Sequence, residues 1–197
     1  MMGSFSPVQN RFMPLRVIAG QLRGKKLATV PGLETRPTAD RTRESIFNIL
    51  GTAVRHALVL DLFAGTGAFG IEALSRGADF ALFIENGREA LGVLTRNIQS
   101  CRLADRARVL HRDAAGSLNG LADGDRKFHL VFMDPPYRAG MIAPVLRHLA
   151  DSRCLEDKAR IVVEHAAGEV VGEVPPFHLQ DHRRYGKTLV SFFTCVL

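Results

Sequence analysis

The segment Asp134-Pro135-Pro136-Tyr137 follows the apolar run 129–133 and combines residue types that could hold a nucleobase amine. A Pro-Pro step removes two backbone donors and leaves its carbonyls as acceptors. Asp134 adds a carboxylate acceptor, and the ring of Tyr137 could stack on a planar base, an interaction worth roughly 1–3 kcal/mol. A simple turn explains the same residues equally well, because Asp and Pro are common turn formers. The four residues therefore predict either a turn or a clamp for an exocyclic amine.

A glycine-rich segment, 57–78, is the second motif and joins an apolar strand pattern to a helical one. Gly65, Gly67 and Gly70 match G-x-G-x-x-G, in which glycines let the backbone approach a ligand closely. Both NAD and S-adenosylmethionine (SAM) sites need this geometry, so the glycines alone do not separate them. Asp61 favours SAM, because a carboxylate could receive the ammonium of its methionine part, directly or through the loop, and would repel a pyrophosphate.

Two further acids follow predicted strands. Glu85 lies 20 residues beyond Gly65, where an acid can accept hydrogen bonds from ribose hydroxyls. Asp113 follows the strand pattern 107–111 and is placed to meet an adenine amine. A helix cap would also explain Asp113, so both interpretations stay open.

The alternation of apolar patterns predicts a doubly wound α/β fold with a mostly parallel sheet. Ligands bind at the carboxyl ends of such strands, so Asp61, Glu85, Asp113 and Asp134 should line one rim. The end of the chain reads as two strands around 185–187, an antiparallel hairpin rather than another strand-helix-strand unit. The expected strands lie near 57–62, 80–84, 107–111, 129–133 and 160–164, and the expected helices near 68–76, 88–100 and 141–150.

Positive charge is concentrated at the start of the chain. Residues 1–50 hold eight basic and three acidic residues, which leaves five of the six net positive charges there. We expect a short β-hairpin over 16–30, a helix over 37–50, and a basic surface that contacts RNA phosphates. A solvated basic surface is the alternative. The candidate contacts are Arg16, Arg23, Lys25, Lys26, Arg36, Arg41 and Arg43, with Arg138 at the rim.

Composition places the chain among single-domain proteins. Its 197 residues suffice for one substantial core, and its three scattered cysteines argue against a disulfide framework. The histidines and cysteines show no metal-ligand spacing, so no metal is expected. The sequence also lacks an apolar stretch of the roughly 20 residues that span a bilayer. These features predict a cytoplasmic protein with no membrane partner, and a monomer by default.

Taken in order, DLFAGTGAFGIEALSRGA, IEN, HRDA and MDPPY resemble the class I SAM-dependent methyltransferases. RVIAGQLRGKKL, RPTADRTRESIFNIL and RRYGKT sharpen the resemblance to the bacterial 16S ribosomal RNA guanine-N2 methyltransferase family, from residue 15 to the end. The resemblance implies a seven-stranded sheet, SAM as cofactor, and 16S rRNA or the small ribosomal subunit as partner. It implies a disordered segment 1–14, a basic extension 15–51 and a catalytic domain 52–197. The implied cofactor residues are Asp61, Phe63, Gly65, Thr66, Gly67, Glu85, Asn86, Asp113, Ala114 and Thr38, and the implied catalytic residues are Asp134, Pro135, Pro136 and Tyr137.

A guanine amine is a weak nucleophile, so positioning should carry much of the catalysis. In our hypothesis Asp134 and the Pro135 carbonyl accept hydrogen bonds from the N2 amine while Tyr137 stacks on the base. The residues leave three rivals open: an adenine-N6 methyltransferase, a protein-glutamine methyltransferase, and a non-catalytic nucleotide-binding RNA module. The basic N-terminal segment argues against the second rival. The choice of guanine over adenine comes from the resemblance alone.

Overall fold

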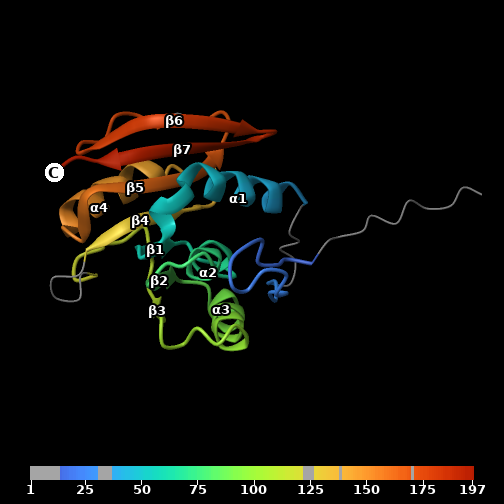
Figure 1. Cartoon of the computed structure of the whole chain (residues 1–197). Helices are drawn as coiled ribbons and strands as arrows, with labels where there is room; N and C mark the ends of the chain where they lie inside the picture. Colours follow the sequence, from blue (N-terminus) through green and yellow to red (C-terminus); the bar gives the residue numbers. More distant parts are fainter. Residues whose placement is uncertain (1–13, 31–36, 122–126, 138, 170) are drawn as a thin grey trace, which may run out of the picture.

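The computed structural model describes residues 14–30, 37–121, 127–137, 139–169 and 171–197, without the side chains of residues 37 and 38. One seven-stranded sheet runs through the molecule in the order β3-β2-β1-β4-β5-β7-β6 (Figure 1). Its strands are β1 (Leu58–Leu62), β2 (Phe80–Glu85), β3 (Ala107–His111), β4 (Phe128–Met133), β5 (Leu155–Ala166), β6 (Phe177–Tyr185) and β7 (Thr188–Cys195). The helices are α1 (Pro37–Leu50), α2 (Ala68–Ser75), α3 (Arg88–Ser100) and α4 (Ile142–Ser152), with a short 3-10 helix η1 (Gly51–Val54) after α1.

The strand directions confirm the predicted fold class. Strands β1 to β5 pair in parallel, whereas β7 is antiparallel to both β5 and β6. The closing hairpin expected around 185–187 is therefore present. Strand β5 differs from the expectation, because it begins at Leu155 rather than near residue 160. Its register with β4 shifts between Phe128 and Leu130, and Lys158 has a φ of 62°, so its first residues form an irregular strand without a regular alternating pattern.

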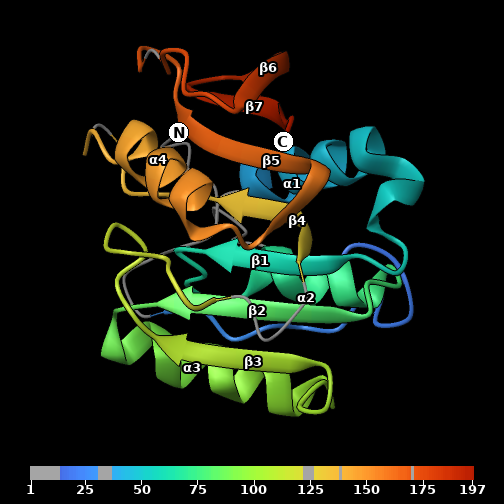
Figure 2. The same cartoon turned by 90° about the vertical axis from the view of Figure 1, so that its left-hand side faces the viewer.

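Alternating strand residues build a core on each face of the sheet. Phe132 and Val162 face α1, α2 and α3 on one side, and Met133 and Val163 face α4 on the other. Figure 2 shows α4 in front of the sheet and α1 behind β4. The central strands β1, β2 and β4 are thus buried on both faces, which explains why they are continuous apolar runs in the sequence.

The N-terminal segment forms a smaller hairpin than predicted. A single antiparallel bridge joins Arg16 to Lys26, and Leu15, Val17 and Leu27 are buried in the same core as α1 and α2. Much of its remaining backbone bonds to side chains of the neighbouring helices instead of to a second strand. The hairpin therefore shares one core with the domain expected over 52–197.

Three polar side chains make these bonds. The Glu72 carboxylate accepts the backbone N–H groups of residues 18 and 19 at 2.7 and 3.0 Å. Ser75 Oγ accepts the N–H of residue 22 at 2.9 Å, and Asn97 Oδ1 accepts that of residue 28 at 2.7 Å. Glu72 and Asn97 are buried at 0% and 2% exposure, and the hairpin backbone, together with Arg76 and the Thr66 carbonyl, supplies their hydrogen-bond partners.

Candidate active site

Four acids line the carboxyl edge of the parallel strands, as predicted. Asp61 is the fourth residue of β1, Glu85 ends β2, Asp113 follows β3, and Asp134 follows β4 directly. The strand order β3-β2-β1-β4 arranges them along one rim in the sequence Asp113, Glu85, Asp61, Asp134. The order of the strands reverses between β1 and β4, and crevices at such switch points are the usual ligand sites of doubly wound sheets.

The glycine loop after β1 is held in an unusual backbone conformation. Phe63, Gly65 and Gly67 have φ values of 60°, 55° and 80°. A Cβ on Gly67 would lie 2.4 Å from Leu94 Cδ1, and one on Gly70 would lie 2.3 Å from the Phe83 ring. Positive φ and close packing together explain why glycine occupies these positions.

Glu85 fastens this loop to the end of β2. Its Oε2 accepts the N–H of Gly65 at 2.8 Å, and its Oε1 accepts the N–H of Gly87 at 2.7 Å. Glu85 was predicted to meet ribose hydroxyls. Each of its oxygens already has a backbone donor, so any hydroxyl would bind to the second lone pair of an oxygen that is oriented by the protein.

Asp61 is almost completely buried, at 2% exposure, and its Oδ2 accepts the N–H of Gly70 at 2.9 Å. Burial raises the pKa of Asp61 to about 8; the bond from Gly70 opposes this shift, and the charge of Glu85 adds to it. Two routes to a ligand ammonium were predicted, one direct and one through the loop. Because Asp61 bonds to the first turn of α2, directly after the loop, and scarcely meets solvent, only the indirect route fits its position.

The other predicted cofactor residues differ in their exposure and in their hydrogen bonds within the protein. The Thr66 carbonyl accepts a hydrogen bond from Asn97 Nδ2 at 2.9 Å, and Ala114 is buried at 3% exposure. Asp113 is exposed, and its Oδ1 accepts the N–H of Ala115 at 2.9 Å in a turn; the described residues 114–121 form no helix, so the alternative of a helix cap is wrong. Asn86 is exposed and Phe63 is half-buried. The side chain of Thr38 lies outside the described residues.

The Asp134-Pro135-Pro136-Tyr137 segment forms a turn whose tyrosine is anchored. The Tyr137 hydroxyl donates to Glu164 Oε1 at 3.1 Å and lies 2.9 Å from Thr188 Oγ1. The Pro136 carbonyl accepts a long bond of 3.4 Å from the N–H of Ala139, so it is not the free acceptor that was expected. Tyr137 is 49% exposed, and burial of the rest raises its pKa to about 12, which keeps the hydroxyl protonated.

Glu164 was not predicted from the sequence, and it is the carboxylate that neighbours Asp134. Met133 pairs with Val163, so the next residues along β4 and β5 are Asp134 and Glu164. The pKa of Asp134 is raised well above its usual range by burial and then by the charges of Glu164 and Asp61. The Asp134 side chain is exposed, so the neighbouring charge of Glu164 is the main physical cause of this shift. The pKa of Glu164 is also raised by burial, against the opposing effects of Tyr137 and Arg43.

Arg43 is a buried cation on the same face of the sheet. It is 4% exposed, and its Nη2 donates to the Arg16 carbonyl at 2.7 Å and to Asp40 Oδ1 at 3.0 Å. Burial lowers its pKa, and the carboxylates of Asp40, Glu72 and Glu164 oppose this effect. Arg43 was predicted to contact RNA; a buried guanidinium that bonds within the protein does not fit that role.

The remaining predicted RNA contacts divide into two groups. Arg36 and Arg138 lie outside the described residues. The others are exposed on the hairpin and on the first turns of α1: Arg16, Arg23, Lys25, Lys26 and Arg41.

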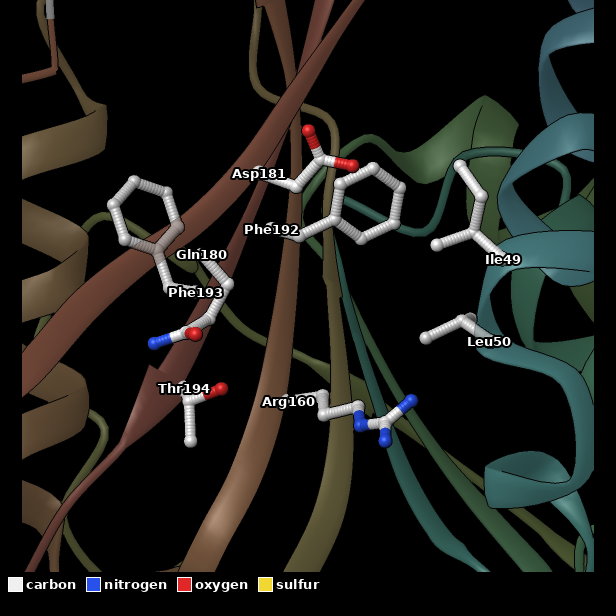
Figure 3. Close-up of a pocket in the computed structure, with 8 residues that line it drawn as sticks. All are labelled: Ile49, Leu50, Arg160, Gln180, Asp181, Phe192, Phe193 and Thr194. Carbon is white, nitrogen blue, oxygen red and sulfur yellow. The ribbon is translucent and has the colours of Figure 1, made fainter.

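A cavity of about 260 Å³ lies away from this rim, between the end of α1 and the outer strands. Figure 3 shows Ile49 and Leu50 facing Phe192, with Arg160 and Asp181 at its border. Arg160 precedes Glu164 by four residues on β5, a separation of about 13 Å along a strand. The cavity is therefore separate from the acids of the rim.

The described residues provide neither a membrane-spanning helix nor a metal site of three or more ligands. Within the ranges stated above, no helix combines the length and apolarity of a membrane span. In the same ranges, no three His, Cys, Asp or Glu side chains converge as a metal site would require.

The sheet order and the rim define a class I methyltransferase fold, which solved methyltransferases of much lower identity share. The chain belongs to the family described as conserved hypothetical protein 95, which matches residues 15–194. Ribosomal RNA small subunit methyltransferase D of Escherichia coli K12 is 39% identical over 161 residues, 82% of this chain and 79% of that protein. YlbH of Bacillus subtilis is 38% identical over 183 residues, 91% of this chain and 98% of that protein. The solved structure of yhhF from Escherichia coli superposes with a TM-score of 0.80 at 35% identity, covering 92% of this chain and 97% of that one.

Proposed function

We propose that this protein transfers a methyl group from SAM to the exocyclic N2 amine of a guanine in 16S rRNA. The observation that carries the proposal is the position of the Asp134 turn next to the glycine loop on one rim. The relative named ribosomal RNA small subunit methyltransferase D supports an rRNA substrate.

The residues of the loop fit SAM as a cofactor. Gly65 and Gly67 bring the backbone close to the rim, and Glu85 holds an oriented carboxylate beside them. Asn86 and the exposed Asp113 would complete the site towards β3. SAM, when bound, supplies a sulfonium methyl that is already strongly electrophilic. The protein therefore has to position the acceptor more than it has to activate the donor.

On the substrate side, Asp134 and the Pro135 carbonyl would accept the two hydrogens of the N2 amine and direct its lone pair towards the methyl. The half-exposed ring of Tyr137 would stack on the base, which must be extruded or already unpaired to reach the rim. Its hydroxyl is bonded to Glu164 and Thr188, which holds the ring in one orientation. The exposed basic side chains of the hairpin would bind RNA phosphates.

Methyl transfer from radiolabelled SAM to small ribosomal subunits, free rRNA and DNA, followed by nucleoside analysis, tests the proposal. We expect labelled N2-methylguanosine from the small subunit or its RNA. Labelled N6-methyladenosine would show an adenine-specific enzyme instead. Calorimetric titration with SAM and with NAD is the control for the cofactor, and binding of NAD alone would contradict the proposal.

A further inference from the structure

We propose that Glu164 recognises the N1–H of the target guanine and thereby makes the site select guanine over adenine. The inference rests on the proposed function and adds a specificity residue to it. It starts from the position of Glu164 beside Asp134, which no local sequence signal indicated.

The register of the sheet places the two carboxylates next to each other. Phe132 on β4 and Val162 on β5 are paired and belong to the core beneath α1. Side chains alternate along a strand, so Glu164 within β5 points to this same face. Asp134, the first residue after β4, lies close enough for the charge of Glu164 to act on it. Neighbouring strands are about 4.8 Å apart, which is the scale on which one base edge can meet two side chains.

Glu164 retains acceptor capacity in this position. Among the described residues, its hydrogen-bond donor is the Tyr137 hydroxyl, which contacts Oε1 at 3.1 Å. A carboxylate offers about four lone-pair sites on its two oxygens. A glutamine would anchor Tyr137 equally well without setting a second negative charge beside Asp134. Burial and then the charge of Glu164 raise the pKa of Asp134, and two hydrogen-bond donors from a ligand would relieve the repulsion between the two carboxylates.

Guanine has the matching pattern of donors. Its Watson–Crick edge presents N1–H and the N2 amine side by side, whereas adenine presents an amine beside an N1 lone pair. With Asp134 on the amine, Glu164 would accept N1–H from guanine but would face the lone pair of adenine. A protein acceptor that hydrogen-bonds to a donor of the substrate discriminates against an analogue without that donor. The acceptor is then desolvated without a partner.

The test uses small subunits reconstituted with RNA in which the methylated nucleotide, once mapped, is either guanine or 2-aminopurine. The analogue 2-aminopurine keeps the N2 amine but lacks N1–H. For the natural protein we expect kcat/KM to be on the order of 10- to 100-fold higher for guanine, the usual effect of one hydrogen bond to a charged group. Glu164→Ala should lower this ratio to near one.

Three variants serve as controls for the ratio. Tyr137→Phe removes the hydroxyl that contacts Glu164 and should preserve the ratio. Glu156→Ala removes an exposed acid from the same strand and should also preserve it. Glu164→Gln keeps a neutral acceptor and should lower the ratio only in part; it carries the test if Glu164→Ala does not fold.

The outcomes separate this inference from the proposed function. If Glu164→Ala slows both substrates equally, Glu164 only positions Tyr137 and the inference is wrong. The inference is also wrong if the natural protein methylates guanine and 2-aminopurine at the same rate, although the proposed function then stands. If the natural protein forms no N2-methylguanosine at all, the proposed function fails and the inference fails with it.

Discussion

The acids on the two sides of the β1–β4 switch point receive different hydrogen-bond donors from the protein. On the glycine-loop side, Asp61 and Glu85 accept three backbone N–H groups, two from loops and one from the first turn of α2. On the other side, Asp134 and Glu164 lie next to each other, and a tyrosine hydroxyl is the donor that the described residues supply to Glu164. Carboxylates of the first kind hold a loop in shape, whereas those of the second kind keep acceptors for a ligand. The comparison predicts that substitutions on the two sides separate cofactor binding from turnover.

The largest effect is expected at Asp134. Asp134→Ala should reduce turnover by about 10²- to 10⁴-fold, because it removes the carboxylate that orients the N2 amine. SAM affinity should remain nearly unchanged, since among the described residues no hydrogen bond joins Asp134 to the glycine loop. Labelled methyl transfer and calorimetric titration with SAM measure the two quantities. An equal loss of both would assign Asp134 to the cofactor site and remove the contrast between the two sides.

Glu85→Ala should show the opposite pattern. It leaves the N–H groups of Gly65 and Gly87 without their acceptor, so we expect SAM affinity to fall by about tenfold or more. The free energy of unfolding should fall by about 1–3 kcal/mol, as is typical when hydrogen bonds of the backbone lose a partner. Titration calorimetry and denaturant unfolding measure these effects. Glu89→Ala, which removes an exposed acid at the start of α3, is the matched control. Unchanged SAM affinity in Glu85→Ala would mean that the loop keeps its shape without this carboxylate.

Asp61 gives a pH-dependent effect on stability. Burial raises its folded-state pKa to about 8, against about 4 in an unfolded chain. Between these values the folded state binds more protons, so the contribution of Asp61 to stability is complete below about pH 4 and is lost as pH rises through about 8. Asp61→Asn cannot titrate and keeps an oxygen for Gly70. The variant should therefore gain stability relative to the natural protein as pH rises across this interval, in denaturant unfolding at several pH values. A difference that is constant with pH would show that Asp61 is ionised in the folded protein.

The smallest effect is expected for the Tyr137 hydroxyl. Tyr137→Phe keeps the ring for stacking and loses the bonds to Glu164 and Thr188, so turnover should fall by no more than about tenfold. Tyr185→Phe is the matched control, because it removes a tyrosine hydroxyl that bonds to Ser45 on α1. Labelled methyl transfer compares the two variants. A collapse of activity in Tyr137→Phe alone would show that the hydroxyl has a chemical role. The substrate site would then include Tyr137 as well as Asp134 and Glu164.

Several features of the site were accessible from the sequence because their signals are local. The Pro-Pro turn, the glycines of positive φ and the acids that end apolar runs each depend on a few adjacent residues. The parallel sheet and its closing hairpin were likewise predicted from alternating apolar patterns, since β1, β2 and β4 are buried on both faces.

Other features had no local signal. Arg43 reads as one more arginine in a basic segment, and only the packing of α1 under the hairpin shows that it is buried. Glu72 and Asn97 read as ordinary helix residues, although they bind the backbone of the hairpin. Glu164 is an isolated acid in an apolar run. In each case the partner lies far away in the sequence, so no pattern within a short window could identify it.

The sequence by itself determined which segments become strands, where the chain must turn sharply, and which acids lie at strand ends. Backbone sterics and side-chain polarity act over a few residues and suffice for these properties. Only the tertiary structure decided which acids receive backbone donors and which face each other. That outcome depends on β4 lying between β1 and β5 in one register, which sets Asp134 beside Glu164 and leaves Asp61 and Glu85 to the glycine loop.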